Sequence, residues 1–237
     1  VSNRQFPVFQ KLLSQEQIEV NKPDSKGNTP LLCAVDLYWS IGDSRFFDAL
    51  IARTDIGINL FNEESSTALS VSCEHELLPA VEKLFRKPGL KVNAEDLPDT
   101  TTPLFCACQR GSREIVALLL SHEEIDVNKE TSDGSTPLTI AICRHPDIAL
   151  QLLEHPKIQV DLAATDGNTP LILAITREDG PHMPLIRRLH TLGADPKATA
   201  DDGASAISLL ENALQHPSPD RAALHDTYRE ILSLLKS

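Results

Sequence analysis

The stretch Gly134–Leu138 reads Gly-Ser-Thr-Pro-Leu, and its last three residues recur along the chain at a nearly constant spacing. Thr-Pro-Leu also stands at Thr29–Leu31, Thr102–Leu104 and Thr169–Leu171, with weaker copies at Thr67–Leu69 and Ser205–Ile207. Successive copies lie 33 to 38 residues apart. A period of this length indicates a repeat protein, in which each copy is a small unit that stacks on its neighbours.

Each strong copy contains the residues that begin a short helix. Gly supplies a turn position with a positive φ, Thr is a good N-cap, and Pro suits the first helical position, where its missing N–H costs nothing. A second helix is plainest at Glu114–Leu120, which has apolar residues along one face. The phrase "LLSHEEIDVN" at Leu119–Asn128 then leads to the next copy, and similar phrases end at Asn21, Asn93 and Asp161. The sequence therefore predicts pairs of helices joined by extended turns.

The Thr-Pro-Leu phrase is followed by Ala five residues after the Thr, at Ala34, Ala107, Ala141 and Ala174. This pattern resembles the ankyrin repeat family, whose repeat of about 33 residues carries T-P-L-H-x-A. The resemblance covers nearly the whole chain, and it implies an all-α ankyrin-repeat solenoid of about five to six repeats plus an N-terminal half repeat. The family's His is absent from every copy, so we expect neighbouring repeats to rely more on apolar contact.

The repeat positions also predict how the chain is divided. Residues 1–21 match the second half of a repeat, 22–199 hold five repeats, and 200–237 form a divergent C-terminal capping repeat. The half repeat suggests a chain that begins inside a longer array, unless Phe6 and Phe9 close this end themselves. The second repeat lacks the Pro and is expected to be irregular.

The first and fifth repeats carry extra residues between their two helices. From Thr29 to Phe46 and from Thr169 to Ile186 the separation is 17 residues, whereas from Thr102 to Ile115 it is 13. We expect a lengthened turn in both repeats.

The composition excludes several classes of function. The chain has 237 residues, of which 41% are hydrophobic, and a net charge of −12. Such an acidic balance argues against nucleic-acid binding, which needs a basic face, and against docking on an anionic membrane. No apolar run approaches the roughly 20 residues that cross a bilayer. The five cysteines are odd in number and widely spaced, which favours a reducing, cytoplasmic compartment over a disulfide framework.

The sequence offers little catalytic chemistry. Cys106 and Cys108 stand two positions apart on a predicted helix and point to different faces, and no second cysteine pair or His lies at zinc-finger spacing. His75 begins a phrase like H-E-x-x-H, but Pro79 stands where the second His is needed. Small apolar packing accounts for the repeat columns that hold Cys33, Cys73, Cys106 and Cys108. We expect no catalytic residue, no metal, no cofactor and no enzymatic activity.

Arginine occupies the position eight residues after the Thr in three successive repeats, at Arg110, Arg144 and Arg177; the same column holds Leu37 and His75. In a stack these positions line up, so they are predicted to form a basic stripe that pairs with a partner's acidic surface. The alternative is that each Arg complements the dipole at a helix C-terminus, which is worth about 0.3–1 kcal/mol.

The predicted turn tips, in contrast, are acidic. They hold Glu63, Glu64, Glu95, Asp96, Asp99, Asp133, Asp166, Asp201 and Asp202. Asp is common in such turns because its side chain accepts backbone hydrogen bonds. The excess of acidic residues could also repel nucleic acid and favour a basic partner.

Tyr38 and Trp39 lie in the extra segment of the first repeat, and Trp39 is the chain's single Trp. Because Tyr and Trp are enriched among binding hot spots, these residues are candidates for contact with a partner. The alternative is that the lengthened turn folds back, and both rings cover an irregular edge against Phe46 or Phe47. Both interpretations stay open.

The resemblance implies a non-catalytic module that binds a protein partner through the inner face of the first helices and the turn tips. Its predicted protein-binding residues are Tyr38, Trp39, His75, Arg110, Arg144 and Arg177. We expect a cytoplasmic monomer without membrane insertion. One alternative is the targeting domain of a larger enzyme, or of a host-directed bacterial effector acting in the host cytosol. A structural spacer is the weakest alternative.

Overall fold

The computed structural model describes residues 5–15, 17–95, 99–164, 166–216 and 224–236. These ranges contain thirteen α-helices and no strand, apart from the isolated β-bridges Phe61–Thr67 and Thr199–Ser205. The all-α fold class that the sequence predicts is therefore confirmed. Asp96, one of the acidic turn residues, lies outside the described ranges, as do parts of the two predicted terminal segments.

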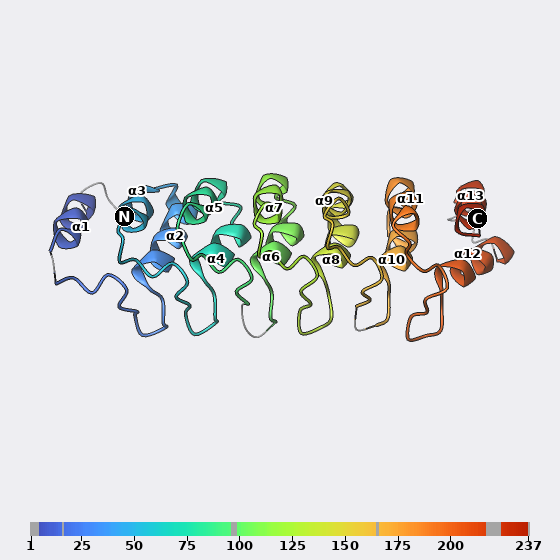
Figure 1. Ribbon diagram of the computed structural model, residues 1–237, viewed down its shortest axis with the longest axis horizontal. Helices are drawn as coiled ribbons and strands as arrows, with labels where there is room; N and C mark the ends of the chain where they lie inside the picture. Colours follow the sequence, from blue (N-terminus) through green and yellow to red (C-terminus); the bar gives the residue numbers. More distant parts are fainter. Residues whose placement is uncertain (1–4, 16, 96–98, 165, 217–223, 237) are drawn as a thin grey trace. The chain divides into compact units, whose positions relative to one another are not determined.

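The chain folds as two compact units, residues 1–125 (unit 1) and 126–237 (unit 2). The helices of unit 1 are α1 (Gln5–Leu13), α2 (Pro30–Ile41), α3 (Arg45–Ile51), α4 (Ala68–Glu74), α5 (Leu78–Phe85), α6 (Pro103–Arg110) and α7 (Arg113–Leu120). Helices α2, α4 and α6 pack side by side in one layer, and α3, α5 and α7 form a second layer against them (Figure 1). The single helix α1 packs on α3 and so extends the second layer.

Unit 2 repeats this arrangement. Its helices are α8 (Pro137–Arg144), α9 (Pro146–Leu152), α10 (Pro170–Thr176), α11 (Met183–Thr191), α12 (Ala206–Gln215) and α13 (His225–Leu235). Helices α8, α10 and α12 form one layer, and α9, α11 and α13 pack against it (Figure 1). The last helix buries Tyr228, Ile231 and Leu235 on one face, which agrees with the periodicity of this segment.

The first helix of each repeat begins as its sequence predicts. In all five repeats the Thr is the N-cap, and its hydroxyl accepts a hydrogen bond from the N–H three residues later, for example at 3.2 Å from Phe105 to Thr102. Where the family pattern has His, the hydroxyl oxygens of Ser70 and Thr139 accept the backbone N–H of Thr67 and Thr136, which completes a capping box. The second repeat lacks Pro, yet its α4 is capped in this way.

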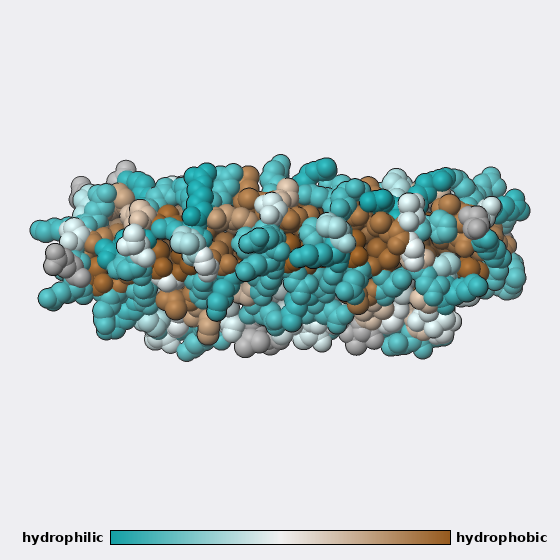
Figure 2. All heavy atoms as spheres, in the orientation of Figure 1, coloured by the Kyte–Doolittle hydropathy of each residue, from teal (hydrophilic) through white to brown (hydrophobic). Residues whose placement is uncertain are grey.

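Each unit buries its own apolar layer between the helices. Ten of these core residues are almost entirely inaccessible to solvent: Phe47, Leu69, Leu104, Ile115 and Leu119 in unit 1, and Leu138, Ile142, Ile148, Leu171 and Ile186 in unit 2. Figure 2 shows hydrophobic residues gathered over the helices, with hydrophilic residues over much of the remaining surface. Helix α1 adds Phe6 and Phe9, whose rings lie 5.3 and 4.9 Å from that of Phe46. The same helix leaves Val8 and Leu12 exposed.

Asparagine side chains link neighbouring repeats at the end of the "VN" phrases. The amide of Asn93 donates to the Glu124 carbonyl at 2.7 Å, and that of Asn128 donates to the Lys157 carbonyl at 2.7 Å. Asn21 and Asn59 make the corresponding bonds in the earlier repeats. Polar links thus supplement the apolar contact that the missing His led us to expect.

The two longer repeats use their extra residues differently. In the first repeat the helix continues, so α2 runs for 12 residues where α6 has 8, and it ends at Gly42 with φ +71°. The expectation of a lengthened turn is wrong here, because Leu37–Ile41 contains no helix breaker. In the fifth repeat α10 stops at Thr176, and Arg177 leaves the helix with ψ 145° ahead of the pair Gly180–Pro181.

None of the five cysteines, all of which lie in the described ranges, forms a disulfide. Cys73, Cys106 and Cys108 are buried, in agreement with packing roles. Cys33 is exposed, which the shared column with Cys106 did not predict, and Cys143 is exposed as well.

Candidate protein-binding surface

Tyr38 and Trp39 lie on the additional turn of α2 and have different environments. Tyr38 is half-buried, and its ring centroid is 6.5 Å from that of Phe47. Trp39 is 58% exposed. Tyr38 thus covers the core near Phe47, as one of the two interpretations holds, whereas Trp39 is presented to solvent.

The Trp39 ring is held from one side by His75. The two ring centroids are 4.2 Å apart and the planes differ by 10°, so the rings are stacked. His75 is the C-cap of α4, directly after its last residue, and its Nε2 lies 3.9 Å from Asp36 Oδ1. Partial burial raises the pKa of the Asp36 carboxyl, although His75 acts in the opposite direction. The sequence placed His75 in the arginine column and at the start of an incomplete H-E-x-x-H phrase, but it did not pair His75 with Trp39.

A groove runs beside this aromatic pair, between α2 and α4 and the two turns that precede them. Its volume is about 520 Å³, and its lining includes Leu32 and Val71. The charged residues that line it are Lys26, Asp36, Glu63, Glu64 and Glu74. Polar and charged residues therefore make up most of the groove lining, and four of its five charged residues named here are acidic.

The acidic residues of the groove differ in how far they are already paired. Glu74 accepts a hydrogen bond from Arg110 at 3.0 Å. The carboxylates of Glu63 and Glu64 are exposed and make no hydrogen bond or ion pair with the described part of the chain. These two residues sit at the turn, where the Glu63 N–H donates to the Lys26 carbonyl at 3.2 Å.

The three arginines of the predicted stripe also have different environments. Arg110 in unit 1 is bound to Glu74, as described above. Arg177 in unit 2 is 9% exposed at its side chain; it donates to the Ile142 carbonyl, and to Asp179 at 2.8 Å. Arg144 is exposed and makes no hydrogen bond or ion pair with described residues.

Arg177 donates to the Ile142 carbonyl, which helix α8 leaves without a hydrogen-bond partner. Ile142 would normally accept from the residue four positions later, but that residue is Pro146, which has no N–H. We predict that Arg177→Met lowers the free energy of unfolding by about 1–3 kcal/mol, because a buried carbonyl loses its partner. Arg144→Gln, the matched surface change, should stay within about 0.5 kcal/mol of the parent. Urea denaturation measures both, and equal stabilities of the two variants would contradict this role for Arg177.

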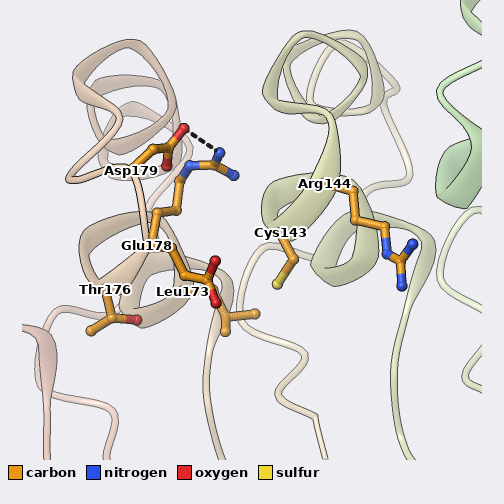
Figure 3. A pocket seen from close by; sticks show the side chains of 7 residues that line it. Cys143, Arg144, Leu173, Thr176, Glu178 and Asp179 are labelled. Carbon is orange, nitrogen blue, oxygen red and sulfur yellow. Dashed lines mark hydrogen bonds and ion pairs between the residues drawn. The ribbon is translucent and has the colours of Figure 1, made fainter.

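A second hollow lies in unit 2 between α8 and α10. It has a volume of about 620 Å³ and is lined by Cys143, Arg144, Leu173, Thr176, Arg177, Glu178 and Asp179. Figure 3 shows the Asp179 ion pair on one side and the Arg144 side chain directed away from it. Partial burial raises the pKa of the Cys143 thiol, although the Arg177 and Arg144 guanidinium groups oppose this shift. The geometry does not favour the thiolate that a nucleophilic cysteine needs.

The buried Cys108 does not offer an activated thiol either. Burial raises the pKa of Cys108 strongly, and Cys106 adds to this shift. Among the residues that the structure describes, no three His, Cys, Asp or Glu side chains are grouped so that they could hold a metal ion. No described helix has both the length and the apolar character required to cross a membrane.

The environment of Trp39 predicts its fluorescence. Because it is the chain's single Trp and is 58% exposed, we expect emission close to that of a solvated indole and strong quenching by acrylamide. His75→Ala should increase quenching further, since it uncovers the second ring face. A blue-shifted emission that is protected from acrylamide would show that Trp39 is covered in the free protein.

Comparison with known sequences agrees with the repeat pattern. Residues 69–164 match the family model of ankyrin repeats, in three copies. A curated relative, the nuclear factor NF-kappa-B p105 subunit of Gallus gallus, is 30% identical over 146 residues. The match covers 61% of this chain and 14% of the length of that relative.

Several solved structures share the fold. The ankyrin repeat protein EF0377 matches with a TM-score of 0.70 at 24% identity, over 88% of this chain and 96% of that one. The ankyrin repeat domain of Bcl-3, a member of the IkappaB family, matches with a TM-score of 0.70 at 22% identity, over 99% and 91%. An ankyrin repeat domain from Acinetobacter baumannii AYE matches with a TM-score of 0.68 at 23% identity, over 81% and 94%. These likenesses concern the fold, and they confirm the all-α ankyrin-repeat class.

Proposed function

Because the chain belongs to the ankyrin repeat family, we propose that it is a non-catalytic module that binds a protein partner. Ankyrin repeats generally mediate protein–protein interaction, and the curated relative is named as a subunit of a protein assembly. The binding surface we propose consists of the groove of unit 1, which His75 and the turn of Glu63 and Glu64 line, together with Trp39, which stacks on His75 beside it.

The single observation that carries this proposal is the exposure of Trp39 on a fixed support. A large aromatic ring at the surface is costly to leave in water, and Trp is prominent among residues that dominate binding energy. Stacking on His75 fixes the ring orientation, so little freedom would be lost when a partner packs on it. Tyr38 supports the same turn through Phe47.

We assign the arginine column a divided role. Arg144 is available for a carboxylate on an acidic part of the partner, because it is exposed and makes no ion pair with the described residues. Arg110 and Arg177 already bind groups of this chain. We therefore propose that Arg110 supports the groove of unit 1 through Glu74, and that Arg177 has a structural role within unit 2.

The proposal includes a monomeric protein of a reducing, cytoplasmic compartment. The absence of disulfides among the five cysteines, all within the described residues, supports the compartment, since exposed thiols such as those of Cys33 and Cys143 are oxidised readily outside it. Light scattering on the purified chain tests the monomeric state; a stable dimer would refute it.

The test of partner binding uses the intact chain as bait in lysate, followed by affinity measurement with the captured protein. Trp39→Ala should weaken binding by about 2 kcal/mol, or roughly 30-fold. Val8→Ala on α1 is the matched control, because it also truncates an exposed hydrophobic residue of unit 1. If a captured protein binds both variants as tightly as the parent, the groove of unit 1 is not the binding surface.

A further inference from the structure

We propose that the N-terminal end of unit 1 is a docking site for an amphipathic α-helix of a protein partner. The docked helix would lie beside α2 and against α1, as one further helix in the layer of α2, α4 and α6. We call this site the end face; it consists of Val8 and Leu12 on α1 and of Cys33, Leu37 and Ile41 on α2. The inference goes beyond the proposed function, because the groove lies on the other side of α2, toward α4.

Helix α1 contains no buried residue, unlike α3, α5 and α7 in the same layer. The phrase "LLSQEQIEVN" that begins on α1 corresponds to "LLSHEEIDVN" on α7, so Val8 and Leu12 occupy the repeat positions of Ile115 and Leu119. Ile115 and Leu119 are almost inaccessible to solvent, whereas Val8 is 61% exposed and Leu12 is 47% exposed. The difference follows from packing, because α7 packs on α6 of its own repeat and α1 packs on α3 of the next one.

The positions four and eight residues after the capping Thr face the preceding helix of the layer. On α4 these positions hold Val71 and His75, which line the groove toward α2. On α6 the second position holds Arg110, which binds Glu74 of α4 at 3.0 Å. The corresponding face of α2 therefore points to the place of a preceding helix, and the described part of the chain has no helix there (Figure 1).

This face of α2 is apolar. Cys33 and Leu37 stand four and eight residues after Thr29, and Ile41 follows one turn later on the same face. Cys33 is exposed, Leu37 is half-buried and Ile41 is 49% exposed. The open position beside α2 accounts for the exposure of Cys33, since Cys106 at the same repeat position is buried. The next four repeats carry a polar residue where α2 carries Leu37, so this face is suited to apolar contact.

The repeat arrangement indicates that the occupant is a helix. A helix beside α2 would meet α1 as α6 meets α7, so it needs apolar residues toward both neighbours and a polar outer face. The helices of each pair are joined by short turns and run antiparallel, which places the N-terminus of the occupant near the C-terminal end of α1. Lys11 stands in the last turn of α1, is exposed and makes no ion pair with the described residues. An acidic first turn in the occupant would pair with Lys11 and complement its own helix dipole.

A second copy of the chain is a poorer occupant. A symmetric contact between two end faces would use five partly exposed side chains on each copy, which offer much less than the roughly 800 Å² per partner of a stable dimer. An end-to-end contact would bring α12 of another copy to the end face. Helix α12 exposes Ser208, Asn212 and Gln215, which are polar and do not match an apolar face. The end face therefore suits a different protein.

Cys33 makes occupation of the end face measurable, because its thiol lies within it. The probe is a hydrocarbon-stapled peptide of about 14 residues, roughly four turns, with leucines along one face and Glu in the first turn. The comparison peptide has the same composition and staple, but its leucines are distributed around the helix. Both are titrated against the full chain, and alkylation at each cysteine is followed by mass spectrometry. At ten times its Kd the probe should slow alkylation of Cys33 about tenfold, whereas the exposed Cys143 of unit 2 should react at an unchanged rate.

Variants locate the site on both helices. Leu12→Ala and Ile41→Ala should each weaken the probe by about tenfold, because each removes apolar contact with the docked helix. Phe61→Ala is the matched control, since it truncates an exposed apolar residue of unit 1 in the turn before α4, and it should leave the affinity unchanged. Replacing Glu by Gln in the first turn of the probe should weaken binding about threefold, and Lys11→Gln should abolish this difference. Thermal melting establishes that each variant is folded.

Equal affinities of the two peptides would overturn the inference, and so would equal slowing of alkylation at Cys33 and Cys143. A dimer of the free chain that Leu12→Ala disperses would show that a second copy covers the end face. The proposed function fails separately, because its test rests on Trp39→Ala, which should leave the affinity of the probe unchanged. A loss as large as that from Leu12→Ala would contradict the location of the site. A captured protein that Val8→Ala weakens would occupy the end face, not the groove.

Discussion

Phe47→Ala is expected to lower the free energy of unfolding of unit 1 by about 3–5 kcal/mol, the range for truncating a buried aromatic residue. Phe47 lies on α3, is completely inaccessible to solvent and is among the largest fully buried side chains. Its ring supports Tyr38 on the additional turn of α2. The substitution should therefore also loosen the turn that carries Trp39, and urea denaturation followed by circular dichroism measures the loss of stability.

Two control variants test whether the loss of stability comes from the burial of the Phe47 ring rather than from the removal of any phenyl ring. Phe61→Ala also removes a phenyl ring, but at a position that is 64% exposed, and it should change the free energy of unfolding by no more than about 0.5 kcal/mol. Phe47→Leu keeps more of the buried volume and should cost less than Phe47→Ala. Because each unit of a repeat protein can unfold separately, the free energies of all three variants are taken from the unfolding transition that Phe47→Ala shifts. Equal effects of the truncations at Phe47 and Phe61 would contradict the packing assigned to α3.

The local helix starts could be predicted because their causes lie within a few residues. Thr as N-cap, Pro at the first helical position and an apolar face each act over one turn, and the five Thr-capped helices follow from them. The same reasoning predicted the pairing of helices, since a single pair cannot bury its apolar face alone.

The longer repeats were harder because the same number of extra residues has two outcomes. Leu37–Ile41 lacks Gly and Pro until Gly42, so helix α2 continues, and this signal was present in the sequence. The fifth repeat has Gly180–Pro181 and a loop. Counting residues gave the length of the insertion, but the distribution of helix breakers decides its conformation.

The candidate site depends on contacts between repeats, which spacing alone does not provide. The stacking of Trp39 on His75 joins residues of two helices, and it depends on the extra turn that places Trp39 beside the end of α4. The arginine column appeared uniform in sequence, yet Arg110 meets Glu74 and Arg177 meets a carbonyl freed by Pro146. Pro146 could have indicated from the sequence that the Ile142 carbonyl needs a partner such as Arg177. The pairing of Arg110 with Glu74 depends on how the neighbouring repeat packs.

The turns of unit 2 approach each other closely at Gly167, which makes this residue sensitive to substitution. Gly167 has φ +74°, and a Cβ atom there would lie 2.6 Å from the backbone nitrogen of Asp201 and 2.8 Å from the Cα of Ala200. The Asp201 N–H also donates to the Asp166 carbonyl at 3.2 Å, which joins successive turns. Backbone atoms cannot move aside as a flexible side chain can, so the two turns would have to separate.

Gly167→Ala should lower the free energy of unfolding of unit 2 by about 2–5 kcal/mol, which combines left-handed backbone strain with overpacking. Gly203→Ala is the matched control, because Gly203 has φ +81° in the same unit and no atom within 4 Å of the added Cβ. It should cost about 1–2 kcal/mol, the strain alone. Urea denaturation of both variants gives the difference, and amide exchange at Asp201 reports whether its hydrogen bond is lost. If the two substitutions cost the same, close approach of the turns does not contribute to the stability of unit 2, and the Gly of the repeat phrase is required for its positive φ alone.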